Sequence, residues 1–123
     1  MTLLNRKFDH LNIGVPNLDS AIKYYEETLG FKYLGRYEGS LKFAFLTDGN
    51  FTYELIEREN ITVSTFDHIA YVSEDIQADY DYYNKLGLTT TEIGIVPYLF
   101  ENGVKYFFIK GANDERIEFC ERL

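Results

Sequence analysis

Two histidines and two glutamates occupy matching positions in the two halves of this 123-residue chain. His10 and His68, the only histidines, each end a Phe-Asp-His tripeptide, and the tripeptides lie 58 residues apart. Glu54 and Glu118 lie 64 residues apart, and each is followed by two apolar residues and a second glutamate. Imidazole nitrogens and carboxylate oxygens together suit divalent ions such as Ni2+, Zn2+, Co2+, Mn2+ or Fe2+. We therefore predict that these four residues are metal ligands.

Each of these residues taken alone has a plainer explanation. A histidine near the start of a strand is usually a surface residue or a satisfied core residue, and a glutamate beside Leu55 and Ile56 would usually face solvent. The metal hypothesis rests on the fact that all four residues stand at repeat-equivalent positions. Independent coincidences would not produce this match.

The rest of the chain repeats in nearly the same register. Tyr24-Tyr25 matches Tyr82-Tyr83 at the 58-residue step, and Leu29-Gly30 matches Leu86-Gly87 one residue earlier. The lengthening to a 64-residue step places seven extra residues in the second half, around 94–103, where Pro97, Asn102 and Gly103 indicate a loop. We expect a single domain, 1–123, made of two repeats at about 7–57 and 66–121, with a linker at 58–65.

Local patterns give each repeat the same elements. The runs 10–15 and 68–72 are rich in β-branched residues and predict strands. Helices are expected after Asn17 and Asp75, which suit the N-cap, and before Gly30 and Gly87. Three further strands are expected in each repeat: 32–38, 41–47 and 51–57, then 89–95, 98–101 with 104–110, and 116–121. The fold class is α+β, with two tandem βαβββ modules forming an eight-stranded, partly closed sheet around a central cavity.

Strand alternation brings the candidate ligands to one face. His10 and Glu54 can meet on the inner face of the first half, and His68 and Glu118 would complete the shell from the second. Cys120 lies two residues after Glu118 and shares its face, but we expect it to pack as a small apolar residue. Alternating aromatic residues on the middle strands fit either a core or a pocket wall: Phe43, Phe45, Tyr98, Phe100, Tyr106 and Phe108. Four cationic residues could hold a substrate carboxylate, although such residues are usually only solvated: Arg36, Lys42, Lys105 and Arg116.

Composition excludes several classes of function. The net charge is -8 and basic residues do not cluster, so nucleic acid is not an expected partner. We find no apolar run long enough for a membrane helix and no signal peptide, and we expect a cytoplasmic protein. The single cysteine cannot form an internal disulfide framework.

With these residues in view, the chain resembles the vicinal oxygen chelate superfamily of glyoxalases, bleomycin resistance proteins and dioxygenases. FDHLNIGVPNLDSAIKYYEETLGFKYLGR looks like that superfamily's opening strand, helix and second strand, and FDHIAYVSEDIQADYDYYNKLGL looks like a second copy. YELIE and ERIEFCE are similar to its last strands, in which the glutamate is a ligand. The order His, Glu, His, Glu matches glyoxalase I (lactoylglutathione lyase). It matches methylmalonyl-CoA epimerase less closely, because Gln typically stands there in place of Glu54.

The resemblance implies a lyase or epimerase acting on a small carbonyl compound or its thiol hemithioacetal, with glutathione or another thiol as a possible cosubstrate. Proton transfer would pass through a metal-bound enediolate, with Glu118 or Glu54 as the base. The resemblance also implies a homodimer. An extradiol dioxygenase would need a histidine on a later strand, which this chain lacks. The alternative function is a non-catalytic antibiotic-binding protein of the bleomycin-resistance type, which the negative net charge would suit.

Overall fold

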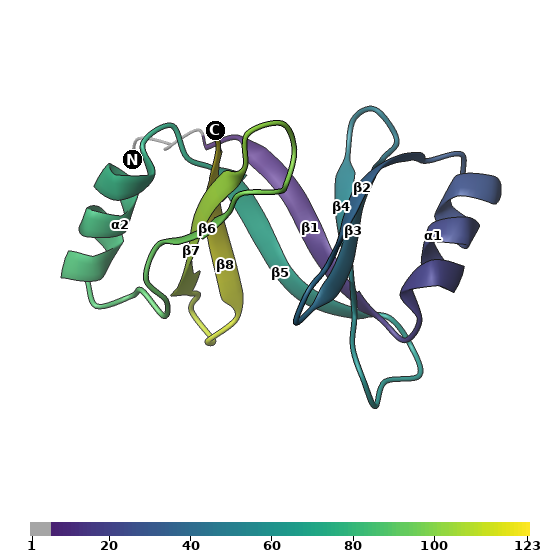
Figure 1. Cartoon of the computed structure of the whole chain (residues 1–123). Coiled ribbons are helices and arrows are strands. Elements are labelled where there is room, and N and C mark those ends of the chain that lie inside the picture. The colour runs from purple at the N-terminus through teal and green to yellow at the C-terminus, as the bar shows by residue number, and fades with distance from the viewer. Residues whose placement is uncertain (1–5) are drawn as a thin grey trace. The chain divides into compact units, whose positions relative to one another are not determined.

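The computed structural model describes residues 6–123, which contain two helices and a single sheet of eight strands (Figure 1). Along the chain the elements are β1 (Phe8–Val15), α1 (Leu18–Glu27), β2 (Lys32–Glu38), β3 (Lys42–Thr47), β4 (Thr52–Glu57), β5 (Thr65–Val72), α2 (Ile76–Lys85), β6 (Gly94–Val96), β7 (Val104–Lys110) and β8 (Arg116–Arg122). Hydrogen-bonded neighbours follow the order β2-β3-β4-β1-β5-β8-β7-β6. This is the predicted pair of βαβββ modules in an α+β fold.

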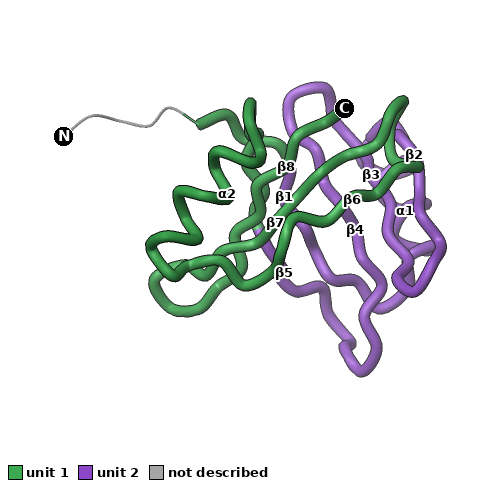
Figure 2. Tube along the Cα trace, turned by 60° about the vertical axis from the view of Figure 1, so that its left-hand side comes forward, with its two compact units in different colours: residues 1–9, 69–123 green, residues 10–68 purple. Residues whose placement is uncertain are grey.

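The chain divides into two compact units, whose boundaries fall inside β1 and β5 (Figure 2). Unit 2 is His10–His68, and unit 1 comprises Met1–Asp9 and Ile69–Leu123. Unit 1 thus takes the first residues of β1, and unit 2 takes the predicted linker with the start of β5. β1 and β5 also begin earlier than expected, at Phe8 and Thr65.

Both helices begin at the expected caps. The side chain of Asn17 accepts a hydrogen bond from the backbone N–H of Ser20 at 2.9 Å, and Asp75 accepts one from that of Ala78 at 3.0 Å. These acceptors satisfy backbone donors that have no partner within the first turn of a helix. Gly30 and Gly87 follow the helices with φ of 72° and 73°, a left-handed conformation that glycine adopts without strain.

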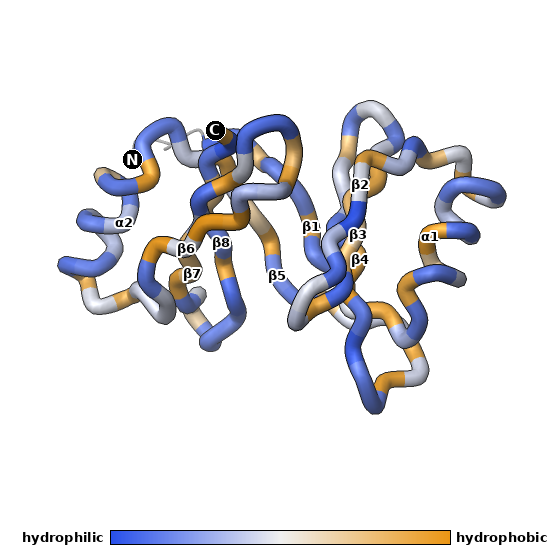
Figure 3. Tube along the Cα trace, in the orientation of Figure 1, coloured by the Kyte–Doolittle hydropathy of each residue, from blue (hydrophilic) through white to orange (hydrophobic). Residues whose placement is uncertain are grey.

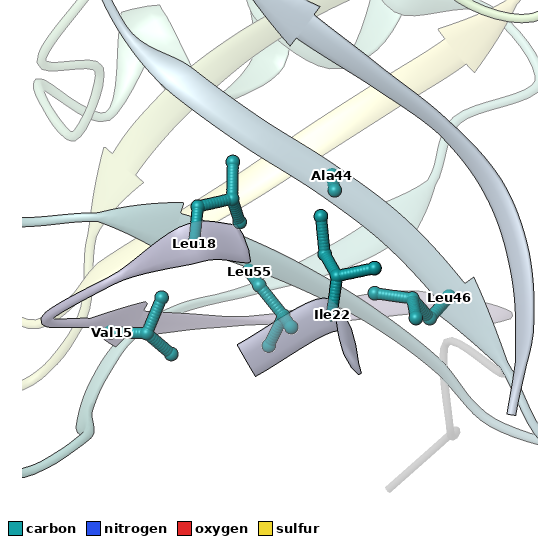
Figure 4. Close-up of a cluster of buried hydrophobic side chains, with 6 residues drawn as sticks. All are labelled: Val15, Leu18, Ile22, Ala44, Leu46 and Leu55. Carbon is teal, nitrogen blue, oxygen red and sulfur yellow. The ribbon is translucent and has the colours of Figure 1, made fainter. Parts of the chain in front are cut away.

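In unit 2, α1 packs on one face of β3 and β4. Leu18 and Ile22 from the helix meet Ala44 and Leu46 from β3 and Leu55 from β4 (Figure 4). Leu18, Ala44, Leu46 and Leu55 are completely buried, and each buried leucine contributes roughly 1.5–3 kcal/mol of transfer free energy. This core fixes the orientation of β3 and β4, so their alternate residues point to the opposite face.

Unit 1 repeats this arrangement with larger side chains. Ile76 from α2 packs with Phe107 and Ile109 from β7 and with Phe119 from β8. The rings of Phe107 and Phe119 stack at 5.3 Å, and these two residues are opposite each other in the register of β7 and β8. Their neighbours Phe108 and Glu118, also paired in that register, therefore point to the other face of the sheet.

The strand expected over 89–95 is mostly wrong, and so is the strand expected over 98–101. Only Gly94–Val96 forms β6, while 98–101 form a turn in which Phe100 has a φ of 58°. Ahead of β6 the backbone pairs with β7 only in part: Thr89 and Ile109 form an isolated bridge, and the N–H of Thr90 donates to the carbonyl of Phe108 at 2.9 Å. The N–H of Phe108 donates to a side chain, Thr91 Oγ1, at 3.0 Å. Alternation of apolar residues cannot distinguish such partial pairing from a continuous strand.

In Figure 3, α2 is largely hydrophilic with short hydrophobic segments, as expected of a helix with one buried face. Within 6–123, no helix combines the length and the apolar character needed to cross a membrane.

Candidate metal centre

Three of the four predicted ligands come together in unit 2. His10 Nε2 lies 3.0 Å from Glu54 Oε1, and His68 Nε2 lies 3.7 Å from the same oxygen. Ligand atoms of the three residues all lie within 4.8 Å of one another, and the two imidazole rings are 5.9 Å apart between centroids. Two ring nitrogens thus face one carboxylate oxygen.

The sheet register explains this convergence. β1 and β4 are parallel, and Glu54 stands opposite Asn12, two residues after His10 on the same face of β1. On its other side Glu54 stands opposite Phe45 of β3, whose ring meets the His10 ring edge-on at 5.3 Å. The ligand residues therefore occupy the sheet face opposite to α1.

The donor set fits a divalent ion. Imidazole nitrogens and carboxylate oxygens bind such ions at about 2.0–2.2 Å, so neighbouring ligands in tetrahedral or octahedral geometry are roughly 3.0–3.5 Å apart. The 3.0 Å separation of His10 Nε2 and Glu54 Oε1 matches this value, and the 3.7 Å separation to His68 needs only a small closure.

Burial adds to this fit. The side chains of His10, Glu54 and His68 are 4%, 11% and 6% exposed. A carboxylate removed from water is stable only with a strong partner, because transfer of an isolated charge into a protein interior is costly. A bound cation would supply that compensation.

A chain of hydrogen bonds connects Arg58 and Asp67 to Nδ1 of His68, the ring nitrogen that does not face Glu54. His68 Nδ1 lies 2.8 Å from Asp67 Oδ1, while Arg58 donates to the other carboxylate oxygen, Asp67 Oδ2, at 3.2 Å from Nε and 2.8 Å from Nη2. Burial by itself would raise the pKa of Asp67, but the hydrogen bonds with His68 and Arg58 outweigh it and hold that pKa far below its usual range. The carboxyl group of Asp67 therefore lies between the imidazole of His68 and the guanidinium of Arg58.

The fourth predicted ligand, Glu118, lies on β8 in unit 1. It is 9% exposed, and it stands opposite Phe108 in the register, as Glu54 stands opposite Phe45. Cys120, two residues later, is 3% exposed. Burial raises the pKa of the Cys120 thiol far above its usual value, and the charges of Asp9 and Glu118 raise it further. The predicted apolar packing role of this cysteine is consistent with both facts.

Comparisons with known proteins agree with the geometry. Residues 7–64 match the family model of the Glyoxalase/Bleomycin resistance protein/Dioxygenase superfamily. The chain is also 35% identical to the uncharacterized protein YwbC of Bacillus subtilis strain 168, over 95% of this chain and 98% of that protein. The chain belongs to this superfamily.

Several solved structures share the fold. A hypothetical protein from Bacillus halodurans C-125, BH1468, is 24% identical and has a TM-score of 0.77, with 97% of this chain and 96% of that chain covered. Methylmalonyl-CoA epimerase from Mycobacterium tuberculosis is 19% identical with a TM-score of 0.74, covering 99% and 93%. A variant of the Streptomyces coelicolor epimerase, in complex with 2-nitronate-propionyl-CoA, is 20% identical with a TM-score of 0.72, covering 94% and 96%.

In this chain the repeat includes residues that sequence reasoning missed. Arg58 and Asp67 were not predicted to belong to the site. The signal was present: the match between repeats extends from ELIER, which ends at Arg58, to EFCER, which ends at Arg122. Arg122 contacts Asp9 at 3.4 Å, so the residue before each histidine is paired with an arginine four residues after a candidate ligand glutamate.

The other candidate residues include both buried and exposed side chains. Phe43, Phe45 and Phe108 are buried, whereas Tyr98 is 83% exposed in the turn after β6. Arg36 forms ion pairs with Asp19 and Glu38, each at 2.7 Å. These ion pairs favour a solvated surface role for Arg36 over the binding of a substrate carboxylate. Arg116 lies over the ring of Phe108 at 4.1 Å.

Proposed function

We propose that this protein is a divalent-metal-dependent isomerase or lyase that transfers a proton at the carbon next to a carbonyl group of a small molecule. The observation that carries the proposal is the convergence of His10 Nε2 and His68 Nε2 on the buried carboxylate of Glu54. Superfamily membership supports a metal centre at such a cluster.

In this proposal His10, His68 and Glu54 hold the ion, and Glu118 is the fourth ligand. Support for Glu118 comes from its burial and from its repeat equivalence to Glu54. Four ligands of this kind leave coordination positions for substrate oxygens on an ion that prefers six. When bound, the ion supplies a Lewis acid that polarises a carbonyl oxygen.

We assign the removal and return of the proton to the glutamates. A substrate whose carbonyl is polarised has a more acidic neighbouring C–H bond, and a carboxylate within reach can take the proton and return it. Glu54 and Glu118 are the candidate bases, and a return of the proton to the other face gives epimerisation, whereas return to the adjacent carbon gives isomerisation. Asn12 and Phe45, which flank Glu54 in the register, would help to exclude water from this carboxylate.

The substrate class is a small carbonyl compound, a hemithioacetal or a thioester. The names of the structural neighbours include methylmalonyl-CoA epimerase, whose named substrate carries a thioester carbonyl. A glyoxalase-type hemithioacetal likewise has a C–H bond beside two oxygen atoms. Both substrates are used in the experiment that follows.

The experiment is a calorimetric titration of chelator-stripped protein with Ni2+, Zn2+ and Mn2+, in wild type, His10→Ala and the surface control Glu59→Gln. We expect wild type and control to bind one ion per chain and His10→Ala to bind at least about tenfold more weakly. The loaded protein is then incubated in D2O with methylmalonyl-CoA or a hemithioacetal, and deuterium incorporation is followed by NMR.

Two outcomes would change the proposal. Absence of ion binding in wild type would remove the enzyme proposal and leave a non-catalytic small-molecule binder of the bleomycin-resistance type. Tight binding without deuterium incorporation in either substrate would keep the metal centre and reject this substrate class.

A further inference from the structure

Arg58, Asp67 and His68 form a chain of contacts within unit 2 that ends at the candidate metal centre. Asp67 uses its two oxygens differently: Oδ1 lies 2.8 Å from His68 Nδ1, and Oδ2 accepts both hydrogen bonds from Arg58. The opposite ring nitrogen, His68 Nε2, faces Glu54. The carboxylate of Asp67 thus links the guanidinium of Arg58 to Nδ1 of the candidate ligand His68.

Arg58 is itself held in place by β1. Its backbone N–H donates to the carbonyl of Val15 at 2.9 Å, which continues the pairing of β1 and β4 past the end of β4. A Cβ added at Gly14 would lie 3.1 Å from Cγ of Arg58. The glycine therefore leaves room for the arginine side chain to pass over β1.

We propose that Asp67 and Arg58 are positioning residues that fix His68 in the tautomer with the proton on Nδ1, so that the lone pair of Nε2 is presented to a metal ion. The inference rests on the proposed metal centre and deepens it. Neutral imidazole carries one proton, so an acceptor at Nδ1 holds the proton there and leaves Nε2 as a donor to the metal. The two hydrogen bonds from Arg58 keep Asp67 oriented as that acceptor.

Strand geometry makes an incidental contact a poor explanation. Successive side chains on a strand point to opposite faces, so Asp67 and His68 would ordinarily diverge. The side chain of Asp67 is nevertheless 14% exposed and lies in contact with both the imidazole and the guanidinium. Two hydrogen bonds from Arg58 hold it in that orientation.

Unit 1 carries an equivalent pair. Asp9 precedes His10 as Asp67 precedes His68, and Asp9 contacts Arg122 through Oδ1 at 3.4 Å. Arg58 and Arg122 each follow a candidate ligand glutamate by four residues. The two repeats differ at most other positions, so retention of Asp, His, Glu and Arg together points to one shared role.

The test reads the histidine tautomers directly on metal-free protein. Long-range 15N–1H correlation spectra are recorded at the alkaline end of a pH titration for wild type, Asp67→Ala and Asp19→Ala. Asp19 is the matched control because it forms an ion pair with Arg36 in the same unit, at 2.7 Å. We expect His68 to carry its proton on Nδ1 in wild type and control, and on Nε2 in Asp67→Ala, while the pattern of His10 stays unchanged.

Zn2+ affinity is measured on the same proteins. We expect Asp67→Ala to weaken binding about 10- to 100-fold and Arg58→Ala to weaken it less, because the carboxylate remains. Asp67→Asn, which keeps the size of the side chain, is measured beside the alanine variant so that a folding defect does not decide the result. Its amide oxygen is a weaker acceptor, and we expect an intermediate affinity.

Retention of the Nδ1 proton in Asp67→Ala would overturn the proposal, and so would a tautomer change that leaves Zn2+ affinity as in wild type. Failure of wild type to bind any divalent ion would instead remove the proposed function. The tautomer spectra need no metal, so they separate that failure from an error in the role of Asp67.

Discussion

Glu57 accepts a hydrogen bond from the backbone N–H of Leu18, the first residue of α1, at 3.0 Å. The repeat-equivalent Glu121 accepts one from the backbone N–H of Ile76, the first residue of α2, also at 3.0 Å. The glutamate three residues after each candidate ligand therefore ties the last strand of its repeat to the helix. The strand that carries the ligand and the helix that covers the opposite face are fixed to each other by one carboxylate.

Replacement of Glu57 or Glu121 by alanine should destabilise the fold by about 1 kcal/mol each. Each change removes an acceptor from a helix N-terminus, where backbone donors lack partners and negative charge is favourable. The free energy of unfolding is measured by urea denaturation of the metal-free variants. Glu59→Ala, in the exposed turn after β4, is the control and should change stability by less than about 0.5 kcal/mol. Equal losses in all three variants would contradict the capping role.

Glu54→Gln tests the ligand and the base together. Glutamine keeps the size of the side chain but is a neutral ligand and cannot accept the proton, so we expect at least about tenfold weaker metal binding and a 10²- to 10⁴-fold lower rate of proton exchange. The metal-free variant should unfold at nearly the temperature of wild type. Glu118→Gln is compared with it: the variant that loses exchange while it still binds metal identifies the base. Normal metal affinity in both variants would remove the ligand assignment.

Acid should weaken the ion pair between Arg6 and Asp79 of α2. Asp79 accepts from Arg6 at 3.0 and 2.9 Å and from the Ser73 hydroxyl at 2.6 Å. Burial opposes the shift, but these hydrogen bonds lower the pKa of Asp79 below its usual value. A carboxyl with a lowered folded-state pKa contributes stability that is fully present above the unfolded value, near about 3.9, and is lost as pH falls through the folded value.

Asp79→Asn should therefore cost about 1–2 kcal/mol at pH 7, and the difference from wild type should shrink as the pH falls below about 4. Urea denaturation at several pH values measures this difference. Asp81→Asn, on the exposed face of the same helix, is the control. A cost that stays constant down to about pH 2 would show that packing, not the charge of Asp79, accounts for it.

Much of the fold followed from the sequence because the repeat is visible in it. The N-caps Asn17 and Asp75, the strands 32–38 and 116–121 to within one residue, and the fold class were all predicted. The segment before β7 was predicted less well. There Thr89 forms only an isolated bridge with Ile109, the N–H of Phe108 donates to the hydroxyl of Thr91, and Phe100 adopts a positive φ that no apolar pattern encodes.

The site was predicted in part. The proximity of His10, Glu54 and His68 was expected from repeat equivalence and strand alternation, and the structure has these three side chains close together. Their role as metal ligands stays a prediction. Asp67 was not predicted because strand alternation assigns it to the sheet face opposite to His68. In the structure its side chain instead contacts the imidazole ring of His68. The roles of Glu118, the homodimer, the thiol cosubstrate and the cytoplasmic location stay predictions.

The thiol of Cys120 should react slowly with maleimide or disulfide reagents in the native protein. Its Sγ is buried and lies 3.6 Å from the carbonyl oxygen of Tyr71, and burial holds its pKa far above the usual value, so the reactive thiolate is scarce. We expect modification at pH 8 to be more than about tenfold slower than in urea-unfolded protein, where the thiol is accessible and titrates normally. The rate is followed by mass spectrometry. A native rate equal to the unfolded rate would mean that β8 opens readily, and Glu118 on the same strand would then be a poor candidate for a preorganised ligand.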